Sequence, residues 1–410
     1  MLLRTLLLRT YLRDRLSHLF AGGDRRRNDP QTPEAAMPAP DLSHVILAPS
    51  AHQPGEIDRL NAILEHAGLG RPLGQPERST PAVAVVPVSD VDPRTVADTL
   101  RQAAPEHGED LLQATAPQEF NVDTVPREPH DHKLFASGKK TGHGTVTWTF
   151  VSHKQMPPAP PWPPDGSRPV VAVLDSGVQH HPWLPAGSSP TFWAPAPWRP
   201  PIRIEQSLFP HVGSYWGHAT FLTGLIRLTA PDAQVLSLQV MKDDGMVNET
   251  NVIDALHWLA DHTENGHVVD VVLMAFGRPW ESTDEGTGPL KTAIDRLGSQ
   301  GVKIVASAGN GATTKRTIPA FLAEGLDSPV VSVGAGNSEA VHAHYSNHGY
   351  WVHKWRCGTD VVSIMPLTLT EAERGEGYAQ WSGTSFSAAI YAGELAHARA
   401  AERTVADTGP

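Results

Sequence analysis

The sequence predicts an α/β fold: a doubly wound, mostly parallel sheet with helices on both faces, preceded by a small N-terminal α/β domain. From Val170 onward, short apolar runs alternate with helical segments, which is typical of a parallel sheet connected by helices. The runs are apolar at successive positions rather than at alternate ones, as strands buried on both faces are. Near the C-terminus, residues 388–398 are rich in alanine, which favours a buried helix that packs closely on its neighbours.

Shifts in composition divide the chain into five predicted segments. Proline-rich stretches such as 157–164 mark stiff linkers, and polar stretches mark looser ones. The segments are a basic N-terminal segment with its linker (1–43), a small α/β domain (44–122), a Pro-rich linker (123–169), the main domain (170–402) and a short tail (403–410).

Charge and apolar runs exclude several classes of protein. The net charge of −11 does not suggest a nucleic-acid partner. The longest apolar run in residues 1–20 is three leucines, too short for a secretion signal or a membrane span, so we expect a cytoplasmic protein without a transmembrane segment. A basic amphipathic helix and a disordered start both remain open for these residues. The single cysteine, Cys357, excludes an internal disulfide, and we expect it to be a small buried side chain.

The predicted helices and strands follow from the periodicity of apolar residues and from the residues that start or end them. In the small domain, a βαβα order emerges, with Asp92 and Pro93 as the start of the second helix. Its strands are 45–48, 82–88 and a third at 111–122, and its helices are 56–67 and 93–104; an edge strand is expected at 145–151. In the main domain the strands are 170–174, 234–240, 268–275, 302–307 and 330–334, and the helices are 219–228, 250–263, 290–300 and 388–398.

Four polar residues stand where these elements meet loops. Asp175 ends a buried strand, His218 begins a helix, Asn310 follows another strand, and Ser385 opens the alanine-rich helix. In open α/β sheets, catalytic groups gather at the carboxyl ends of the strands. Each residue alone also has a structural explanation: a solvated carboxylate, a structural histidine, a turn asparagine or a helix cap. The four in this order are more informative than any one of them.

Together the motifs resemble those of the subtilisin-like serine proteases, the subtilases, over residues 165–402. Asp175-Ser176-Gly177, the helix start at His218 and Gly383-Thr384-Ser385 match that family's Asp, His and Ser motifs, in the family's chain order. Asn310 falls where the family has its oxyanion residue. The resemblance implies a serine endopeptidase with Asp175, His218 and Ser385 as catalytic triad and with Asn310 in the oxyanion hole.

The resemblance also implies a substrate edge, with departures from the family pattern. Ala275-Phe276-Gly277 replaces the family's Ser-Leu-Gly, the segment expected to pair with an extended peptide. Ala219 and Phe221 replace a glycine and a histidine near the helix start, and Ala389 replaces a proline. Because these departures leave the chemical groups in place, an active enzyme is favoured. The alternative is an inactive or weak subtilase-fold module that binds peptides.

Other expectations concern regulation and cofactors. Family propeptides are small α/β modules, so residues 44–122 are either a cleaved, autoinhibitory propeptide or a permanent regulatory domain. No cofactor is expected; the resemblance allows structural calcium, but no residues identify a site, and none is assigned to a metal. Two other residues resemble site residues but do not fit the family order: His143 precedes Asp175, and Asn337 lies beyond the segment that follows Asn310. The cluster His130-Asp131-His132 is interpreted as a solvated turn.

Overall fold

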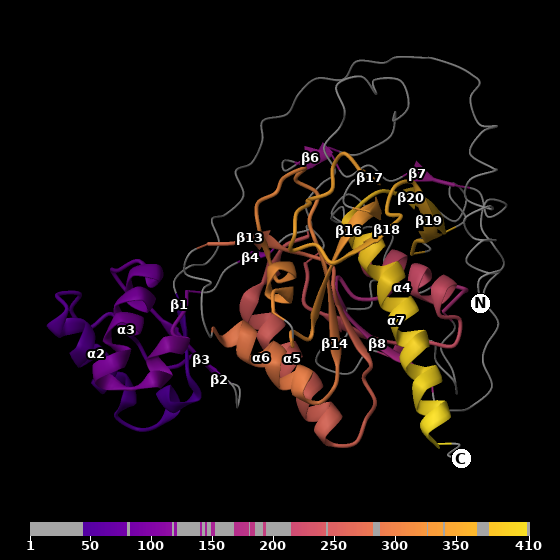
Figure 1. Ribbon diagram of the computed structural model, residues 1–410. Coiled ribbons are helices and arrows are strands. Elements are labelled where there is room, and N and C mark those ends of the chain that lie inside the picture. The colour runs from indigo at the N-terminus through magenta and orange to yellow at the C-terminus, as the bar shows by residue number, and fades with distance from the viewer. Residues whose placement is uncertain are drawn as a thin grey trace. The chain divides into compact units, whose positions relative to one another are not determined.

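Figure 1 shows the computed structural model of the chain. All the described residues belong to one compact unit. They are residues 44–79, 83–116, 119–120, 140–141, 144–145, 149–151, 168–179, 181–184, 192–193, 215–242, 245–281, 288–325, 327–338, 341–366 and 377–407. His143 and His130-Asp131-His132 lie outside these ranges.

An eight-stranded, mostly parallel sheet forms the centre of the main domain. Its order is β17-β16-β14-β12-β8-β10-β9, with β18 also paired to β16; every pairing is parallel except β16 with β17. The strands are β8 (Val170–Asp175), β9 (Phe192–Trp193), β10 (Gln234–Gln239), β12 (Val271–Met274), β14 (Lys303–Ser307), β16 (Val330–Ser338), β17 (Val341–His342) and β18 (Lys354–Arg356). All four residues of β12 are buried, as expected for a strand covered on both faces.

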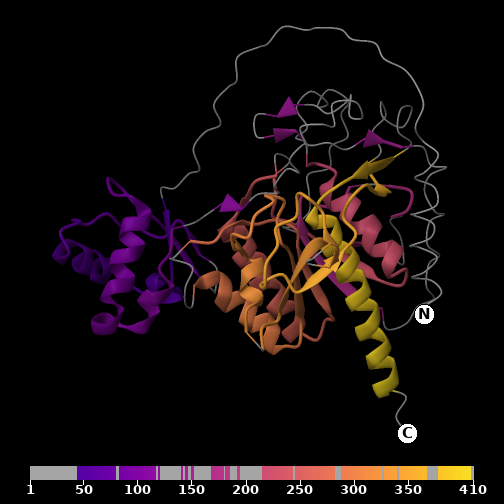
Figure 2. The same ribbon diagram turned by 45° about the horizontal axis from the view of Figure 1, so that its top comes forward.

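Helices cover the sheet in two pairs. α4 (His218–Thr229) packs against α7 (Thr384–Asp407), and α5 (Glu249–Glu264) packs against α6 (Pro289–Ser299). Figures 1 and 2 show the two pairs on opposite faces of the strands. The small residues of α7 allow a close approach: a Cβ at Gly393 would lie 3.1 Å from the carbonyl oxygen of Ile226 and would clash with Thr229 of α4. The doubly wound α/β architecture predicted from the apolar runs is confirmed.

Short strands complete the main domain. A three-stranded antiparallel sheet is formed by β19 (Val361–Ile364), β20 (Tyr378–Trp381) and β7 (Thr149–Phe150), so part of the expected edge strand at 145–151 pairs here. Two-residue strands pair as β13 (Arg278–Pro279) with β15 (Thr317–Ile318), β11 (Val247–Asn248) with β4 (Glu119–Phe120), and β5 (Lys140–Thr141) with β6 (Gly144–Thr145). Among the helices described, none is both long and apolar enough to cross a membrane.

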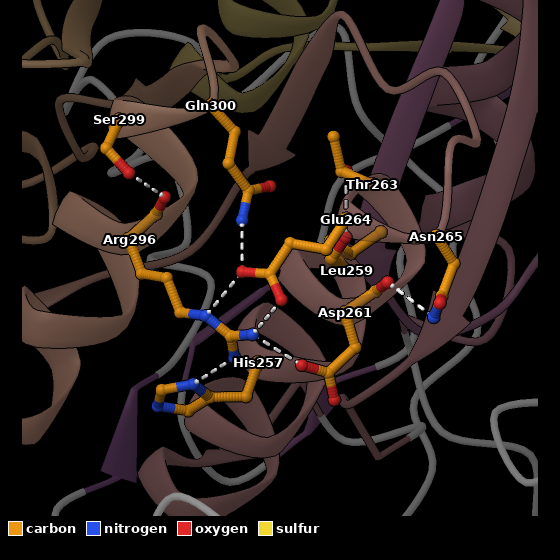
Figure 3. A network of polar contacts seen from close by, with 9 residues as sticks. All are labelled: His257, Leu259, Asp261, Thr263, Glu264, Asn265, Arg296, Ser299 and Gln300. Atoms are coloured by element: carbon orange, nitrogen blue, oxygen red, sulfur yellow. Dashed lines mark hydrogen bonds and ion pairs between the residues drawn. The ribbon is translucent and has the colours of Figure 1, made fainter.

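A polar network centred on Arg296 joins α5 to α6 (Figure 3). Its guanidinium donates from Nη2 to Asp261 (2.6 Å) and binds both carboxylate oxygens of Glu264, at 3.2 and 2.8 Å. Gln300 donates to the same Glu264 carboxylate at 2.9 Å, and Nη1 of Arg296 lies 3.3 Å from Nδ1 of His257. Because Arg296 is a donor, this contact requires an unprotonated Nδ1 on His257.

This contact predicts a pH-dependent stability. Burial first, and then the Arg296 cation, lower the pKa of His257 below its usual value. Neutral His257 therefore stabilises the fold fully above about pH 6.5, the ordinary histidine pKa, and this contribution is lost as the pH falls through and below that value. Between about pH 7.5 and 5.5, we expect the melting temperature of His257→Gln to fall less than that of the wild type. Exposed His66→Gln is the control, and an equal fall in all three proteins would contradict the prediction.

The small unit has its own sheet and core. β1 (His44–Leu47), β3 (Ala84–Pro87) and β2 (Arg78–Ser79) form an antiparallel sheet in the order β1-β3-β2. It is accompanied by α2 (Glu56–His66), α3 (Pro93–His107) and the 3-10 helices η2 (Pro49–His52) and η3 (Glu109–Gln113). As expected, Asp92 caps α3, accepting a hydrogen bond from the backbone N–H of Arg94.

Two sequence expectations are wrong in this structure. The first is the third strand at 111–122. Of the described residues in this range, Leu111–Gln113 belong to η3, Thr115 forms a single antiparallel bridge with Ile46, and Glu119–Phe120 pairs with β11 instead; the third strand of the small sheet is Arg78–Ser79. A short apolar run does not distinguish a strand from a helical turn, which explains the error. Cys357 is exposed rather than buried, because it lies in the loop that leaves β18 at the edge of the sheet.

Candidate active site

A buried carboxylate–imidazole pair lies at the carboxyl end of the central sheet. Asp175 is the last residue of β8 and His218 is the first residue of α4. Nδ1 of His218 lies 2.9 Å from each carboxylate oxygen of Asp175, and Oδ1 of Asp175 also accepts the backbone N–H of Ser176 at 2.8 Å. Because carboxylate oxygens accept, Nδ1–H is the donor in this contact, which leaves Nε2 as the ring nitrogen that can offer a lone pair to another group.

Aromatic side chains surround this imidazole. The rings of Trp381, Tyr215 and Phe386 lie 5.5, 5.8 and 5.8 Å from the ring of His218, which is 1% exposed. Nε2 of His218 is buried and has no hydrogen-bond partner among the described residues. An unpaired polar atom in such a site costs free energy, which indicates a group that acquires its partner from a substrate or from a rotated side chain.

Ser385 lies in the first turn of α7, beside this pair. It is the second residue of the helix, it is 3% exposed, and the ring of the next residue, Phe386, contacts His218. In this structure its hydroxyl donates to the carbonyl oxygen of Ala275 at 3.1 Å. This hydrogen bond belongs to one rotamer of the serine side chain. Rotation about the Cα–Cβ bond would turn the hydroxyl toward a different acceptor. The positive end of the helix dipole favours a developing negative charge here.

Asn310 is held in one orientation by Thr384, the first residue of α7. Its side-chain oxygen accepts the backbone N–H of Thr384 at 2.8 Å and the Thr384 hydroxyl at 2.9 Å. The amide group, Nδ2, is therefore turned toward Gly383, where an added Cβ would lie 3.5 Å from it. The same threonine hydroxyl accepts the N–H of Gly309 at 3.1 Å, and Gly309 has φ of +99°, which glycine adopts without strain.

The predicted substrate edge continues β12. Ala275 and Phe276 are buried and Gly277 is partly exposed. A Cβ at Gly277 would lie 3.1 Å from the carbonyl oxygen of Ile318 in β15, so no larger residue fits there without a shift. This segment lies next to the serine through the Ser385–Ala275 hydrogen bond.

The departures from the family pattern fill the core around the site. Phe221 is fully buried, with its ring 4.7 Å from Phe386 and 5.7 Å from Trp381, the same rings that enclose His218. Ala219 and Ala389 are fully buried as well. Because each replacement is an apolar side chain inside the fold, the departures change packing and leave the polar groups of the site in place.

Several structural partners at the site were missed from the sequence. Thr384 was quoted only as part of a motif, yet it holds both Gly309 and Asn310. A buried ion pair, Arg278 with Glu249 at 3.9 Å, joins the residue after the substrate edge to the start of α5. The spacing of residues along the sequence does not indicate either contact, because each one joins segments that are far apart in the chain.

No metal site emerges in the described part of the chain. There, no group of three or more His, Cys, Asp or Glu side chains is placed to hold a metal ion. Outside the site, the rings of the half-buried His342 and His348 stack 4.3 Å apart.

Comparison with known proteins identifies the family. The model of the subtilase family matches residues 166–407, more than half of the chain. The chain belongs to the subtilase family. Subtilisin BL of Lederbergia lenta is 27% identical over 252 residues, a match that covers 62% of this chain and 83% of that protein. Subtilisin E of Bacillus subtilis (strain 168) is 27% identical over 232 residues, which cover 56% of this chain and 55% of that protein.

Among solved structures, the prenylagaramide maturation protease PagA is 21% identical, with a TM-score of 0.43, and the match covers 58% of this chain and 78% of that one. Subtilases are serine peptidases, so peptide-bond hydrolysis at a serine is the general activity of the family to which this chain belongs.

Proposed function

We propose that this subtilase is an active serine endopeptidase whose catalytic triad is Asp175, His218 and Ser385. The observation that carries the proposal is the buried Asp175–His218 pair next to the start of α7: among the described residues, Nε2 of His218 has no hydrogen-bond partner. Structural roles for a histidine seldom leave a buried ring nitrogen unpaired, whereas a general base needs that lone pair.

The chemistry follows from these positions. The Ser385 oxygen attacks the peptide carbonyl carbon while Nε2 of His218 takes the hydroxyl proton, and Asp175 stabilises the resulting imidazolium. When the C–N bond breaks, His218 returns the proton to the leaving amine and an acyl-enzyme remains on Ser385. Water then repeats the sequence: His218 takes its proton, hydroxide adds to the acyl carbon, and the carboxylic acid leaves as Ser385 recovers its proton.

Asn310 is proposed as a donor to the oxyanion, together with the backbone N–H of Ser385. The fixed Asn310 oxygen supports this role, because it turns Nδ2 away from Thr384 and toward the serine loop. Donors that are held in place before the reaction need no reorganisation when the negative charge develops.

The substrate is proposed to be a polypeptide bound as an extended strand along Ala275, Phe276 and Gly277. Backbone pairing gives affinity that depends little on the peptide sequence. The location of this segment beside Ser385 supports the assignment.

Incubation with an unfolded protein such as denatured casein tests the proposed activity. We expect internal cleavages, identified by mass spectrometry of the products, and complete loss of cleavage after treatment with a small sulfonyl fluoride that acylates activated serines. Binding of casein without cleavage, and without reaction at Ser385, would favour the peptide-binding module instead.

Residues 44–122 are proposed to inhibit the catalytic domain. Two contacts support this proposal. In β1, Val45 and Leu47 pack into the core of the small unit, whereas Ile46, on the opposite face, belongs to the core of the main sheet. The second contact lies further along the chain. After Thr115, which pairs with Ile46, β4 pairs antiparallel with β11 of the main domain, just before α5.

The proposed inhibition predicts faster labelling when β4 is broken. Proline does not donate to a strand ladder, so Phe120→Pro is expected to weaken the pairing of Phe120 with Val247. We expect Ser385 to react with a fluorophosphonate about tenfold faster in this variant, the equivalent of about 1.4 kcal/mol. Phe120→Ala, which keeps the backbone N–H, is the matched control. Equal rates in the wild type and the proline variant would contradict autoinhibition by this segment.

Cleavage of the chain distinguishes a propeptide from a permanent domain. A new N-terminus between about residues 115 and 168 in the purified wild type, absent from Ser385→Ala, would favour a self-processed propeptide. An intact chain that hydrolyses casein would favour a permanent regulatory domain.

A further inference from the structure

Asn347 is a buried amide that the proposed chemistry does not use directly. It lies in the loop between β17 and β18, and it is 1% exposed. A buried asparagine side chain needs partners for its oxygen and its two N–H groups. In this molecule its partners belong to one short segment, residues 308–313, which carries Asn310 in its middle.

The hydrogen bonds of Asn347 bracket Asn310 on both sides. On the preceding side, Nδ2 donates to the carbonyl oxygen of Ala308 at 2.8 Å, and the backbone N–H donates to the carbonyl oxygen of Gly309 at 2.9 Å. On the following side, the side-chain oxygen accepts the N–H of Gly311 at 2.9 Å and that of Thr313 at 3.3 Å.

One residue of the bracketed segment has an unfavourable backbone conformation. Ala312, which has a side chain, has φ of +51°, in the left-handed region that favours glycine. A non-glycine residue in the left-handed region persists only where the surroundings fix it. Here the contacts next to Ala312 include those of Asn347 and that of Tyr345, whose carbonyl oxygen accepts the N–H of Ala312 at 2.9 Å.

We propose that Asn347 is the positioning residue of the oxyanion hole: it fixes residues 308–313 so that the Asn310 amide faces the oxyanion formed at Ser385. The inference rests on the proposed function of the site. Asn310 is held at its side chain by Thr384 and at its backbone by Asn347, so both ends of the donor are fixed before substrate binds. Because displacements of about 1 Å cost catalysis heavily, loosening this segment lowers the turnover rate without weakening substrate binding.

A double-mutant cycle with Asn310 tests this role. Asn310→Ala is expected to lower kcat by about 10²–10³-fold, a range known from a subtilisin. Asn347→Leu, similar in size but without polar groups, is expected to lower kcat by about 10–100-fold with KM within about twofold. In the double variant, kcat is expected to stay within about threefold of Asn310→Ala alone, because Asn347 acts through a donor that is already gone.

Controls separate positioning from folding. Asn347→Ser, which keeps one polar group, is expected to fall between the wild type and the leucine variant, and Asn337→Leu, an exposed asparagine on β16, is expected to leave kcat unchanged. Thermal unfolding of each full-length variant identifies losses due to unfolding, and folded fractions are used to correct kcat.

The results distinguish this inference from the proposed function. If the effects of Asn347→Leu and Asn310→Ala on kcat multiply in the double variant, or if Asn347→Leu changes only KM, the positioning role is wrong while the peptidase assignment stands. If neither the wild type nor Phe120→Pro hydrolyses casein or reacts with a fluorophosphonate at Ser385, the proposed function is wrong and the inference falls with it.

Discussion

Replacing Ser385 by alanine is expected to lower kcat for peptide hydrolysis by about 10⁶-fold, the size of effect known for the nucleophile of a subtilisin. The alanine removes the oxygen that would form the acyl-enzyme and leaves the buried Asp175–His218 pair in place. The fold should be retained, because among the described residues the Ser385 hydroxyl makes one hydrogen bond, to the carbonyl oxygen of Ala275. Initial rates on a fluorogenic peptide, together with circular dichroism, measure both quantities.

Ser387 provides a matched control on the same helix. Its hydroxyl is also buried, and it donates to the carbonyl oxygen of Arg356 at 2.9 Å. Ser387→Ala should therefore lose about 1 kcal/mol of stability and keep most of its kcat. Peptide hydrolysis by Ser385→Ala at more than about a hundredth of the wild-type rate would contradict its assignment as nucleophile.

The second large effect is expected at Asp175. Asp175→Asn keeps the shape of the side chain but replaces a carboxylate that only accepts with an amide that can donate to Nδ1 of His218. The ring is then stabilised in the tautomer that carries its proton on Nε2, where it cannot act as a base. We expect kcat to fall by about 10⁴-fold near neutral pH.

Asp270 is the control for removing a buried carboxylate. It is 2% exposed and accepts the N–H of Val170 at 2.7 Å, at the opposite end of β8 from Asp175. Asp270→Asn should lower stability and leave kcat within a few-fold of the wild type. If Asp175→Asn behaves as Asp270→Asn does, Asp175 has a structural role only.

Much of the architecture could be predicted because the main strands are buried on both faces. Runs such as Val271–Met274 have no polar positions, and only a covered parallel sheet accommodates several of them in sequence. The same topology explains why Asp175 and Asn310, far apart in the chain, meet at one edge: they follow parallel strands that end on the same side. His218, the first residue of α4, and Ser385, the second residue of α7, join them because these two helices pack together.

Features set by distant contacts could not be predicted. Cys357 lies exposed in the loop that leaves β18, and its neighbour Gly358 approaches the backbone of Gly383 so closely that no side chain would fit there. Asn347 lies among histidines in a loop that has no periodic pattern, and its importance lies in partners more than thirty residues away in the sequence. Such hydrogen bonds join loops, so the periodicity of apolar residues, which indicates helices and strands, gives no sign of them.

Fluorophosphonate labelling of the full-length protein, with the adduct located by peptide mass mapping, tests the central claim most directly. It requires only an activated serine and no knowledge of the natural substrate. The account predicts one adduct, at Ser385, in the wild type, faster in Phe120→Pro and absent from Ser385→Ala. An adduct at another residue, or none in either the wild type or Phe120→Pro, would contradict the assignment of Asp175, His218 and Ser385 as a working triad.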